Sequence, residues 1–283
     1  MTERTAERTA PRTFVAPKVP EVFVLFWVVK LLTTAIGETG ADFMGTTNLV
    51  MAGVVGIGGF FAALWWQLRA STYSPIRYWT TVLMVAVFGT MVADGPHVVL
   101  GTPYYVDSCV YLLALVAVLT WWRSSEGTLS VHSITTARRE RFYWATVLLT
   151  FGLGTALGDT TAINMHMGFM GSIVLFGVLI LVPLAAWRLG ANAVVCFWAA
   201  YSLTRPLGAS VADWLAHAKD QGGVALGTGP VTAAGLLAFV VLVAYLWRTH
   251  GDEEGHHALA HAEPEDVMGH SAAEDVRRAS DPR

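Results

Sequence analysis

The chain is poor in charged residues. They make up 14% of its 283 residues, whereas soluble domains carry roughly a quarter. Hydrophobic residues (Ala, Val, Ile, Leu, Met, Phe, Trp, Tyr and Cys) make up 54% of the chain. This balance excludes a soluble enzyme and a nucleic-acid-binding protein, and it predicts an integral membrane protein with the lipid bilayer as its main partner.

Cysteine and the common catalytic motifs are scarce as well. The only two cysteines, Cys109 and Cys196, are expected at opposite ends of their spans, so a disulfide between them is not expected. No CxxC, HExxH or GxSxG pattern occurs. The sequence therefore predicts a protein that is not an enzyme and gives no certain cofactor.

Long apolar stretches dominate what is present. A helix that crosses the bilayer needs about 20 apolar residues. Eight stretches meet this length: 20–42, 48–68, 78–97, 104–122, 142–162, 167–187, 191–214 and 229–247. Lys and Arg gather in the loops of one side, and only Lys219 lies in a loop of the other. By the positive-inside rule both termini are cytoplasmic, in a multi-pass protein of the bacterial inner membrane.

A pattern of tryptophan, glycine and aspartate repeats four times at fixed spacing, W-x9-G-x4-D. Each copy lies on an odd-numbered span, and each even span ends in tryptophan shortly before an arginine. The four copies are Trp27, Gly37 and Asp42; Trp79, Gly89 and Asp94; Trp144, Gly154 and Asp159; and Trp198, Gly208 and Asp213. The repeating unit is therefore a two-helix hairpin.

The predicted fold is all-α, with eight transmembrane helices in four two-helix repeats of parallel orientation, related by a pseudo-rotation about the membrane normal. Charges inside the bilayer occur only on odd spans, so the odd helices are expected inside and the even helices outside. The oligomeric state is left open. The predicted boundaries are a disordered arm 1–17, repeats 18–70 and 71–123, a linker 124–141, repeats 142–189 and 190–249, and a disordered His-rich tail 250–283.

Several segments are similar to a known family. They include Lys18-Val-Pro-Glu-Val, Gly37-Glu38-Thr39-Gly40-Ala41-Asp42, Gly154-Thr-Ala-Leu-Gly-Asp159 and Leu203-Thr-Arg-Pro-Leu-Gly-Ala-Ser210. In these the chain resembles a bacterial family of uncharacterised membrane-anchored proteins, described as four tandem repeats of two transmembrane helices with a tryptophan. The resemblance covers about residues 18–248. It implies the architecture and no activity.

The charges inside the bilayer are the candidate functional residues. The carboxylates predicted to bind or pass a cation are Glu38, Asp42, Asp94, Asp159 and Asp213, and their predicted charge partners are Lys30 and Arg205. Rings of carboxylates select cations. The excess of negative charge suits a divalent cation or protons.

Helical periodicity predicts two further layers on the tryptophan face. Seven residues after each tryptophan the chain has Thr34, Ala86, Phe151 and Arg205, and eleven residues after it has Glu38, Thr90, Thr155 and Ala209. The two layers are about 6 Å apart, so Glu38 and Arg205 are predicted to pair. Proline removes a helical hydrogen bond, and Pro206 is expected to break its span.

Histidines add a weaker indication of metal binding. His97 and His166 follow Asp94 and Asp159 by three and seven residues, and the tail carries five more histidines. Imidazole would shift the preference towards Mn²⁺, Fe²⁺ or Zn²⁺. The alternatives are interfacial polar residues and a solvated tail for the histidines, helix capping for the aspartates, interface anchoring for the tryptophans, and a purely structural role for the Glu38–Arg205 pair.

The leading functional hypothesis is a transporter or channel for a divalent cation. A second hypothesis is a transporter of a small organic or anionic solute that Lys30 and Arg205 bind. An intramembrane enzyme with metal-assisted hydrolysis is a third, and a non-catalytic structural membrane protein a fourth. The two transport hypotheses differ in whether the aspartates or Arg205 are essential.

Overall fold

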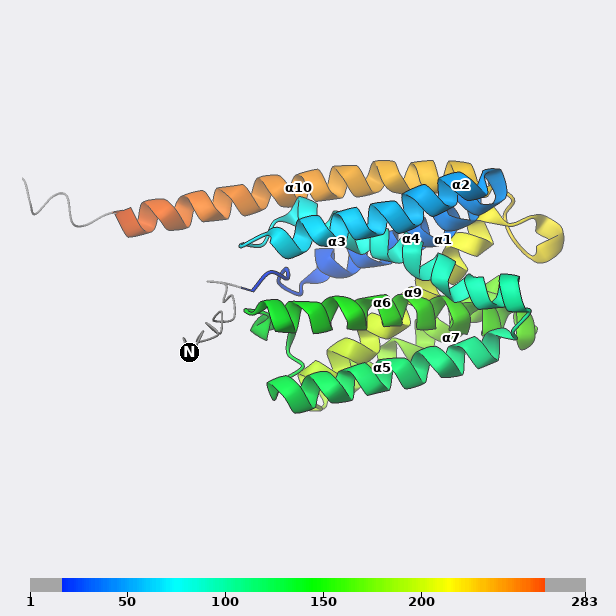
Figure 1. Cartoon of the computed structure of the whole chain (residues 1–283), viewed down its shortest axis with the longest axis horizontal. Helices are drawn as coiled ribbons and strands as arrows, with labels where there is room; N and C mark the ends of the chain where they lie inside the picture. The colour runs from blue at the N-terminus through cyan, green and yellow to red at the C-terminus, as the bar shows by residue number, and fades with distance from the viewer. Residues whose placement is uncertain (1–16, 263–283) are drawn as a thin grey trace, which may run out of the picture.

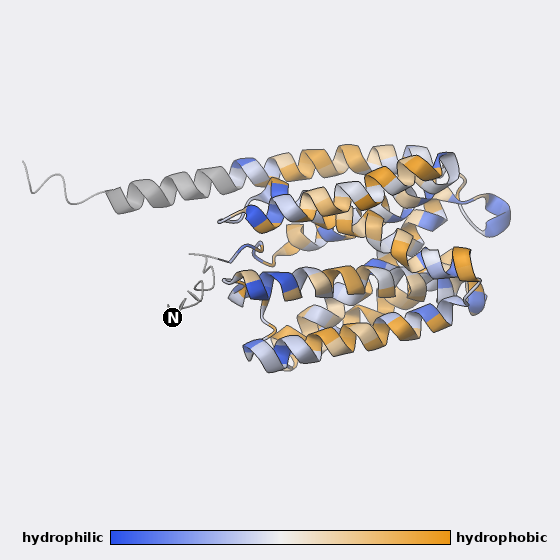
Figure 2. Ribbon diagram, in the orientation of Figure 1, coloured by the Kyte–Doolittle hydropathy of each residue, from blue (hydrophilic) through white to orange (hydrophobic). Residues whose placement is uncertain are grey.

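The computed structural model describes residues 17–262, with side chains through Thr249. Helices dominate this range, and no β-strand occurs within it. Seven helices of the described residues are long and apolar enough to cross a membrane. Figure 2 shows hydrophobic residues along the length of the bundle and hydrophilic residues mostly at its two ends. This distribution supports a multi-pass membrane protein.

The helices run back and forth along one axis (Figure 1). The long ones are α1 (Val24–Thr47), α4 (Pro75–Leu100), α5 (Tyr104–Glu126), α6 (Ala137–Asp159), α9 (Ala193–Ala216) and α10 (Thr228–Ala262). The shorter ones are α2 (Leu49–Ala52), η1 (Gly53–Gly58), α3 (Gly59–Arg69), η2 (Val131–Ser133), η3 (Thr160–Asn164), α7 (Gly168–Leu179), α8 (Leu181–Arg188) and η4 (Lys219–Gln221). The connections 70–74, 127–136 and 189–192 lie together at one end of the bundle, which we call the connection end.

Local sequence explains where the long helices begin and end. Helix α4 begins with Pro75, whose fixed φ suits the first turn. It ends at Leu100, directly before Gly101, whose φ of 68° favours glycine. Helix α6 begins after Thr136, whose hydroxyl accepts a hydrogen bond from the N–H of Arg139. These end signals set the depth at which the functional side chains of each helix lie.

One of the eight predicted spans, residues 191–214, is not among the seven. It corresponds to α9, which is as long as α1 but carries Arg205, Pro206 and Asp213 in its interior. These residues lower its hydropathy. Helix α9 packs against α1, α6 and α7, so protein surrounds the polar side chains of this helix.

The expected break at Pro206 is wrong. Helix α9 continues through Pro206 from Ala193 to Ala216. The proline ring lies against Gly154 of α6, where the missing side chain leaves room for it, and the helix runs on although one backbone hydrogen bond is missing. The irregular segments lie elsewhere. They are two π-helical turns, η1 in the return from α2 to α3, and η3 directly after Asp159.

Helices α1, α4, α6 and α9 contact one another in a closed ring. Helix α1 packs against α4, α4 against α6, α6 against α9, and α9 against α1. The other helices cover this ring in cyclic order, with α3 on α4, α5 on α6, α7 on α9, and α10 on α1. Each covering helix thus packs on the ring helix that follows it in the chain, and α10 closes the circle on the first.

The repeated glycines allow this ring to close. Each one contacts the residue that lies seven positions after the tryptophan of the next ring helix. The four contacts are Gly37 with Ala86, Gly89 with Phe151, Gly154 with Arg205, and Gly208 with Thr34. In each case an added Cβ would overlap the neighbour, so glycine is required by close approach of the backbones.

Replacing Gly154 by alanine is expected to lower the free energy of unfolding by about 1–3 kcal/mol, because the new methyl group overlaps Arg205 and Pro206. Denaturant unfolding in detergent micelles measures the change. Gly158→Ala, one turn further along α6, is the matched control, since its Cβ would meet nothing closer than 3.9 Å. Equal stability of the two variants would contradict the role given to the glycine ring.

A second ring, of aromatic side chains, lies at the tryptophan layer. The residue before each tryptophan packs on the next tryptophan around the circle. The ring centroids are 5.5 Å apart for Phe26 and Trp79, 5.6 Å for Tyr78 and Trp144, 6.0 Å for Tyr143 and Trp198, and 5.8 Å for Phe197 and Trp27. Three of these tryptophans are buried, and Trp27 is partly exposed. Their observed contacts are those of packing.

The predicted disordered arm 1–17 and tail 250–283 lie partly outside the described residues. Helix α10 continues to Ala262, into the segment 250–283 that the sequence assigns to a disordered tail. The rest of that tail, with His270, and the predicted arm up to residue 16 lie outside the described residues.

Candidate functional site

Arg205 occupies the centre of the helix ring and is completely buried. One guanidinium nitrogen donates to the Glu38 carboxylate at 2.6 Å and to the Thr155 hydroxyl at 2.7 Å, and it also contacts the Thr90 hydroxyl. The other terminal nitrogen donates to the Thr34 carbonyl at 2.6 Å. The predicted Glu38–Arg205 pair is confirmed.

Each ring helix contributes one side chain to this cluster. Glu38 comes from α1, Thr90 from α4, Thr155 from α6 and Arg205 from α9. Thr90 and Thr155 belong to the layer of Glu38, eleven residues after their tryptophans. The sequence predicts that they lie in this layer but assigns them no function. Their shared distance from the tryptophans is the pattern that could have linked them to Glu38.

Three carboxylates lie together beside this cluster. Oxygen atoms of Glu38, Asp42 and Asp94 all lie within 4.8 Å of one another. Glu38 is buried, whereas Asp42 and Asp94 are partly exposed. Within residues 17–249, the carboxylates of Asp42 and Asp94 accept no hydrogen bond. The structure thus brings three of the five predicted carboxylates together, and we call them the acidic cluster.

The other two aspartates lie nearby but outside the acidic cluster. Asp159 and Asp213 are both within electrostatic range of Glu38 and of Asp42. The capping alternative does not fit their positions. Asp159 precedes η3 without a capping hydrogen bond, and Asp42, Asp94 and Asp213 lie inside α1, α4 and α9. These carboxylates therefore do not serve to end helices.

The histidines do not join the acidic cluster. His97 lies against the Thr102 carbonyl at 2.7 Å and stacks on Tyr104. His166 is exposed, with its ring nitrogen 3.1 Å from the Asn164 carbonyl. Both side chains are engaged with their own connecting segments, and metal binding by them stays a prediction.

Lys30 lies apart from the carboxylates. Its side chain is 1% exposed, and within residues 17–249 its ammonium nitrogen has no hydrogen-bond partner. The nitrogen stands over the rings of Phe151 and Tyr201, 3.9 and 4.4 Å from their centroids. Aromatic faces attract a cation but supply no counter-charge.

A buried ion pair at the connection end was missed by the sequence reasoning. Lys18, which precedes α1, lies 2.5 Å from the Glu140 carboxylate of α6, and Gln67 of α3 donates to the same carboxylate at 3.2 Å. Glu140 was not singled out, because it lies among arginines at the start of its helix. Close by in the bundle, the Tyr78 and Tyr143 hydroxyls are 2.5 Å apart, from equivalent positions before two tryptophans.

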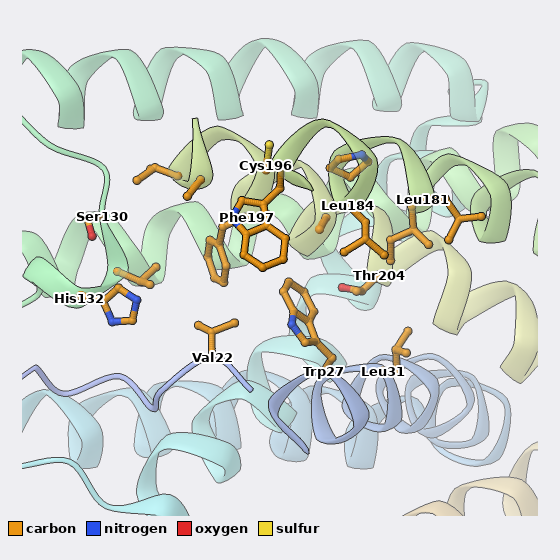
Figure 3. Close-up of a pocket in the computed structure, with 17 residues that line it drawn as sticks. Val22, Trp27, Leu31, Ser130, His132, Leu181, Leu184, Cys196, Phe197 and Thr204 are labelled. Carbon is orange, nitrogen blue, oxygen red and sulfur yellow. The ribbon is translucent and has the colours of Figure 1, made fainter. Parts of the chain in front are cut away.

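An apolar pocket of about 510 Å³ lies between α1, α8 and α9. Figure 3 shows Trp27, Leu31, Phe197 and other side chains that line it. No carboxylate and no Lys or Arg lines it. The pocket is therefore separate from the acidic cluster, although Thr204 places it beside Arg205 in the chain.

Comparison with known proteins gives one match. The model of a family described as Repeat of Unknown Function (DUF347) matches residues 77–128, 142–190 and 196–252, which together are more than half of the chain. No curated protein and no solved structure matches. The three matched segments each hold a ring helix and the helix that returns from it. The chain belongs to this family of membrane-type helical repeats, Repeat of Unknown Function (DUF347).

Proposed function

We propose that this protein is a membrane transporter for a divalent cation, which binds at the acidic cluster. The observation that carries the proposal is the convergence of Glu38, Asp42 and Asp94 oxygens within 4.8 Å, two of them without a hydrogen-bond donor. Carboxylates so close together repel one another, and a cation between them removes the repulsion. Asp159 and Asp213 lie within electrostatic range of the same carboxylates.

The ligand atoms favour a hard cation. The acidic cluster contains carboxylate oxygens and no imidazole or thiolate. Such ligands suit Mg²⁺, Ca²⁺ and Mn²⁺ better than Zn²⁺ or copper. His97 and His166 lie outside the cluster, so the shift towards Mn²⁺, Fe²⁺ or Zn²⁺ that imidazole ligands would cause has no support from these two residues.

A transporter is favoured over an open channel. Arg205 fills the axis of the ring next to the acidic cluster, and a fixed guanidinium there opposes the passage of a second cation. A cation that binds Glu38 competes with Arg205 for the same carboxylate. Cation binding at the acidic cluster therefore weakens the Glu38–Arg205 ion pair between α1 and α9. We infer that this loss changes how the ring helices pack.

We further infer the arrangement in the bilayer. Residues 18–70 act as a fourth repeat, because α1 and α3 make the same cyclic contacts as the three matched segments. The ring helices form an inner layer and the covering helices face lipid, in keeping with the greater burial of α1, α4 and α6. The connection end carries most of the arginines, so we place it on the cytoplasmic side of a bacterial inner membrane.

The alternative of an anionic or organic solute has less support. Arg205 already donates to Glu38, to two threonine hydroxyls and to a carbonyl, so a solute would have to displace these partners. Lys30 has no such partner, but the rings of Phe151 and Tyr201 flank it closely. The hypothesis of a non-catalytic structural protein requires no bound ion.

Asp42→Asn and Asp94→Asn are expected to weaken Mn²⁺ binding by at least tenfold. Loss even of an outer partner of a metal site costs roughly 10–100-fold in affinity, and these residues would be direct ligands. Calorimetry or Mn²⁺ electron paramagnetic resonance on the purified protein measures the affinity. Asp220→Asn, an exposed residue in a loop at the same end of the bundle, is the matched control. Unchanged Mn²⁺ affinity in both variants, or no binding by the unaltered protein, would refute the proposal.

A further inference from the structure

Lys30 is the group whose surroundings the proposed cation site leaves unexplained. A buried ammonium group is costly unless an acid and hydrogen bonds compensate it. The Lys30 side chain is fully enclosed, and within the described side chains its nitrogen bonds to no protein atom. Phe151 and Tyr201 offer only their ring faces.

No neighbouring element supplies the missing acid. On α1 itself the nearest acid is Glu38, two turns away, and Arg205 holds it. Helix α9 offers Tyr201 and the positive Arg205, and α6 offers Phe151. Helix α4 carries no charged residue between Arg77 and Asp94, and α10 carries none between Thr228 and Trp247. The Lys30 amine is therefore free to gain or lose a proton without breaking an ion pair.

Polar groups extend from Lys30 towards both ends of the ring. Towards the connection end lie Tyr201, whose hydroxyl makes no hydrogen bond within residues 17–249, and then the Tyr78 and Tyr143 hydroxyls, which bond to each other. Towards the other end lie Arg205 and the acidic cluster. Ionisable groups inside a membrane protein are typical of proton and ion pathways.

From this arrangement we propose that Lys30 carries a proton that the protein exchanges for the divalent cation. The inference rests on the proposed function. When a cation enters the acidic cluster, the N–H bond of the Lys30 ammonium breaks, the electron pair stays on nitrogen, and the proton passes to water on the side from which the cation came. The reverse step reprotonates Lys30 from the opposite side, where the cation leaves.

Electrostatic repulsion couples the two sites. Eight residues separate Lys30 from Glu38 on α1, or about 12 Å along the helix. At an effective dielectric constant of about 20, a unit charge at that distance changes an equilibrium about tenfold, and a divalent ion changes it about a hundredfold. A cation bound at the acidic cluster therefore weakens proton binding by Lys30, and a proton on Lys30 weakens cation binding, although the two sites are not in contact.

Proton flux in proteoliposomes tests the exchange. The purified protein is reconstituted with a pH-sensitive dye inside the vesicles, the membrane potential is clamped with K⁺ and valinomycin, and Mn²⁺ is added outside. We expect Mn²⁺ uptake with a simultaneous rise of the internal pH. Mn²⁺ uptake without any proton movement would overturn the exchange, whereas no Mn²⁺ uptake or binding at all would instead overturn the proposed function.

Two substitutions assign the proton to Lys30. Lys30→Met is expected to keep Mn²⁺ binding and to reduce the proton flux at least tenfold, whereas Lys30→Arg, which stays charged, weakens Mn²⁺ binding as well. Lys219→Met, in an exposed loop, is the matched control. A normal proton flux in Lys30→Met would contradict the assignment. If Lys30→Met fails to fold, normal proton flux in Lys30→Arg contradicts it equally.

Discussion

Arg205→Gln is expected to lower the free energy of unfolding by about 3–5 kcal/mol, because it leaves Glu38 buried without its counterion. The guanidinium also ceases to donate to the Thr90 and Thr155 hydroxyls, which keep the Glu38 carboxylate as an acceptor. Denaturant unfolding in detergent micelles measures the loss. Arg188→Gln, at an exposed helix end, is the matched control, and equal stability of the two variants would contradict the importance of the central pair.

The double variant Glu38→Gln, Arg205→Gln separates a structural from a functional role of this pair. Removing both charges restores most of the stability if the cost lies in the unpaired carboxylate. Cation uptake is then measured in the stable double variant. Normal uptake would restrict the pair to fixing the contact between α9 and α1, whereas lost uptake in a stable protein assigns it to transport as well.

The repeat spacing allowed much of the fold to be predicted. Equal distances from Trp27, Trp79, Trp144 and Trp198 place equivalent residues at the same depth, so the layers of Arg205 and Glu38 could be assigned before any contact was known. The cyclic contacts of the glycines follow the same offsets. Periodicity predicts depth and face well, because both depend only on helix geometry.

Contacts between segments that the repeat does not relate could not be predicted. Lys18 and Glu140 have no equivalents in the other repeats, so no pattern linked them. Pro206 was expected to break its helix, because the sequence does not reveal that its ring packs against Gly154 of α6 in an unbroken α9. His97 was placed near Asp94 in sequence, but its ring lies against the Thr102 carbonyl in the connection that follows α4.

Lys18→Met is the second substitution with a large expected effect, about 3–5 kcal/mol on the free energy of unfolding. It leaves the Glu140 carboxylate buried without its counterion, while the amide of Gln67 still donates to it. The pair joins the segment before α1 to α6, across the ring, and so holds the first and third ring helices together at the connection end.

The measurement is again denaturant unfolding in micelles, with Glu21→Gln as the matched control because Glu21 is exposed and only three residues from Lys18. Lys18→Met combined with Glu140→Met should recover stability, since an apolar pair of similar size avoids the cost of burying charge. A Lys18→Met variant as stable as Glu21→Gln would contradict this account. Because the pair lies far from the acidic cluster, Mn²⁺ affinity in the stable double variant should remain unchanged. Unchanged affinity would show that the Lys18–Glu140 pair stabilises the helix ring and takes no part in cation binding.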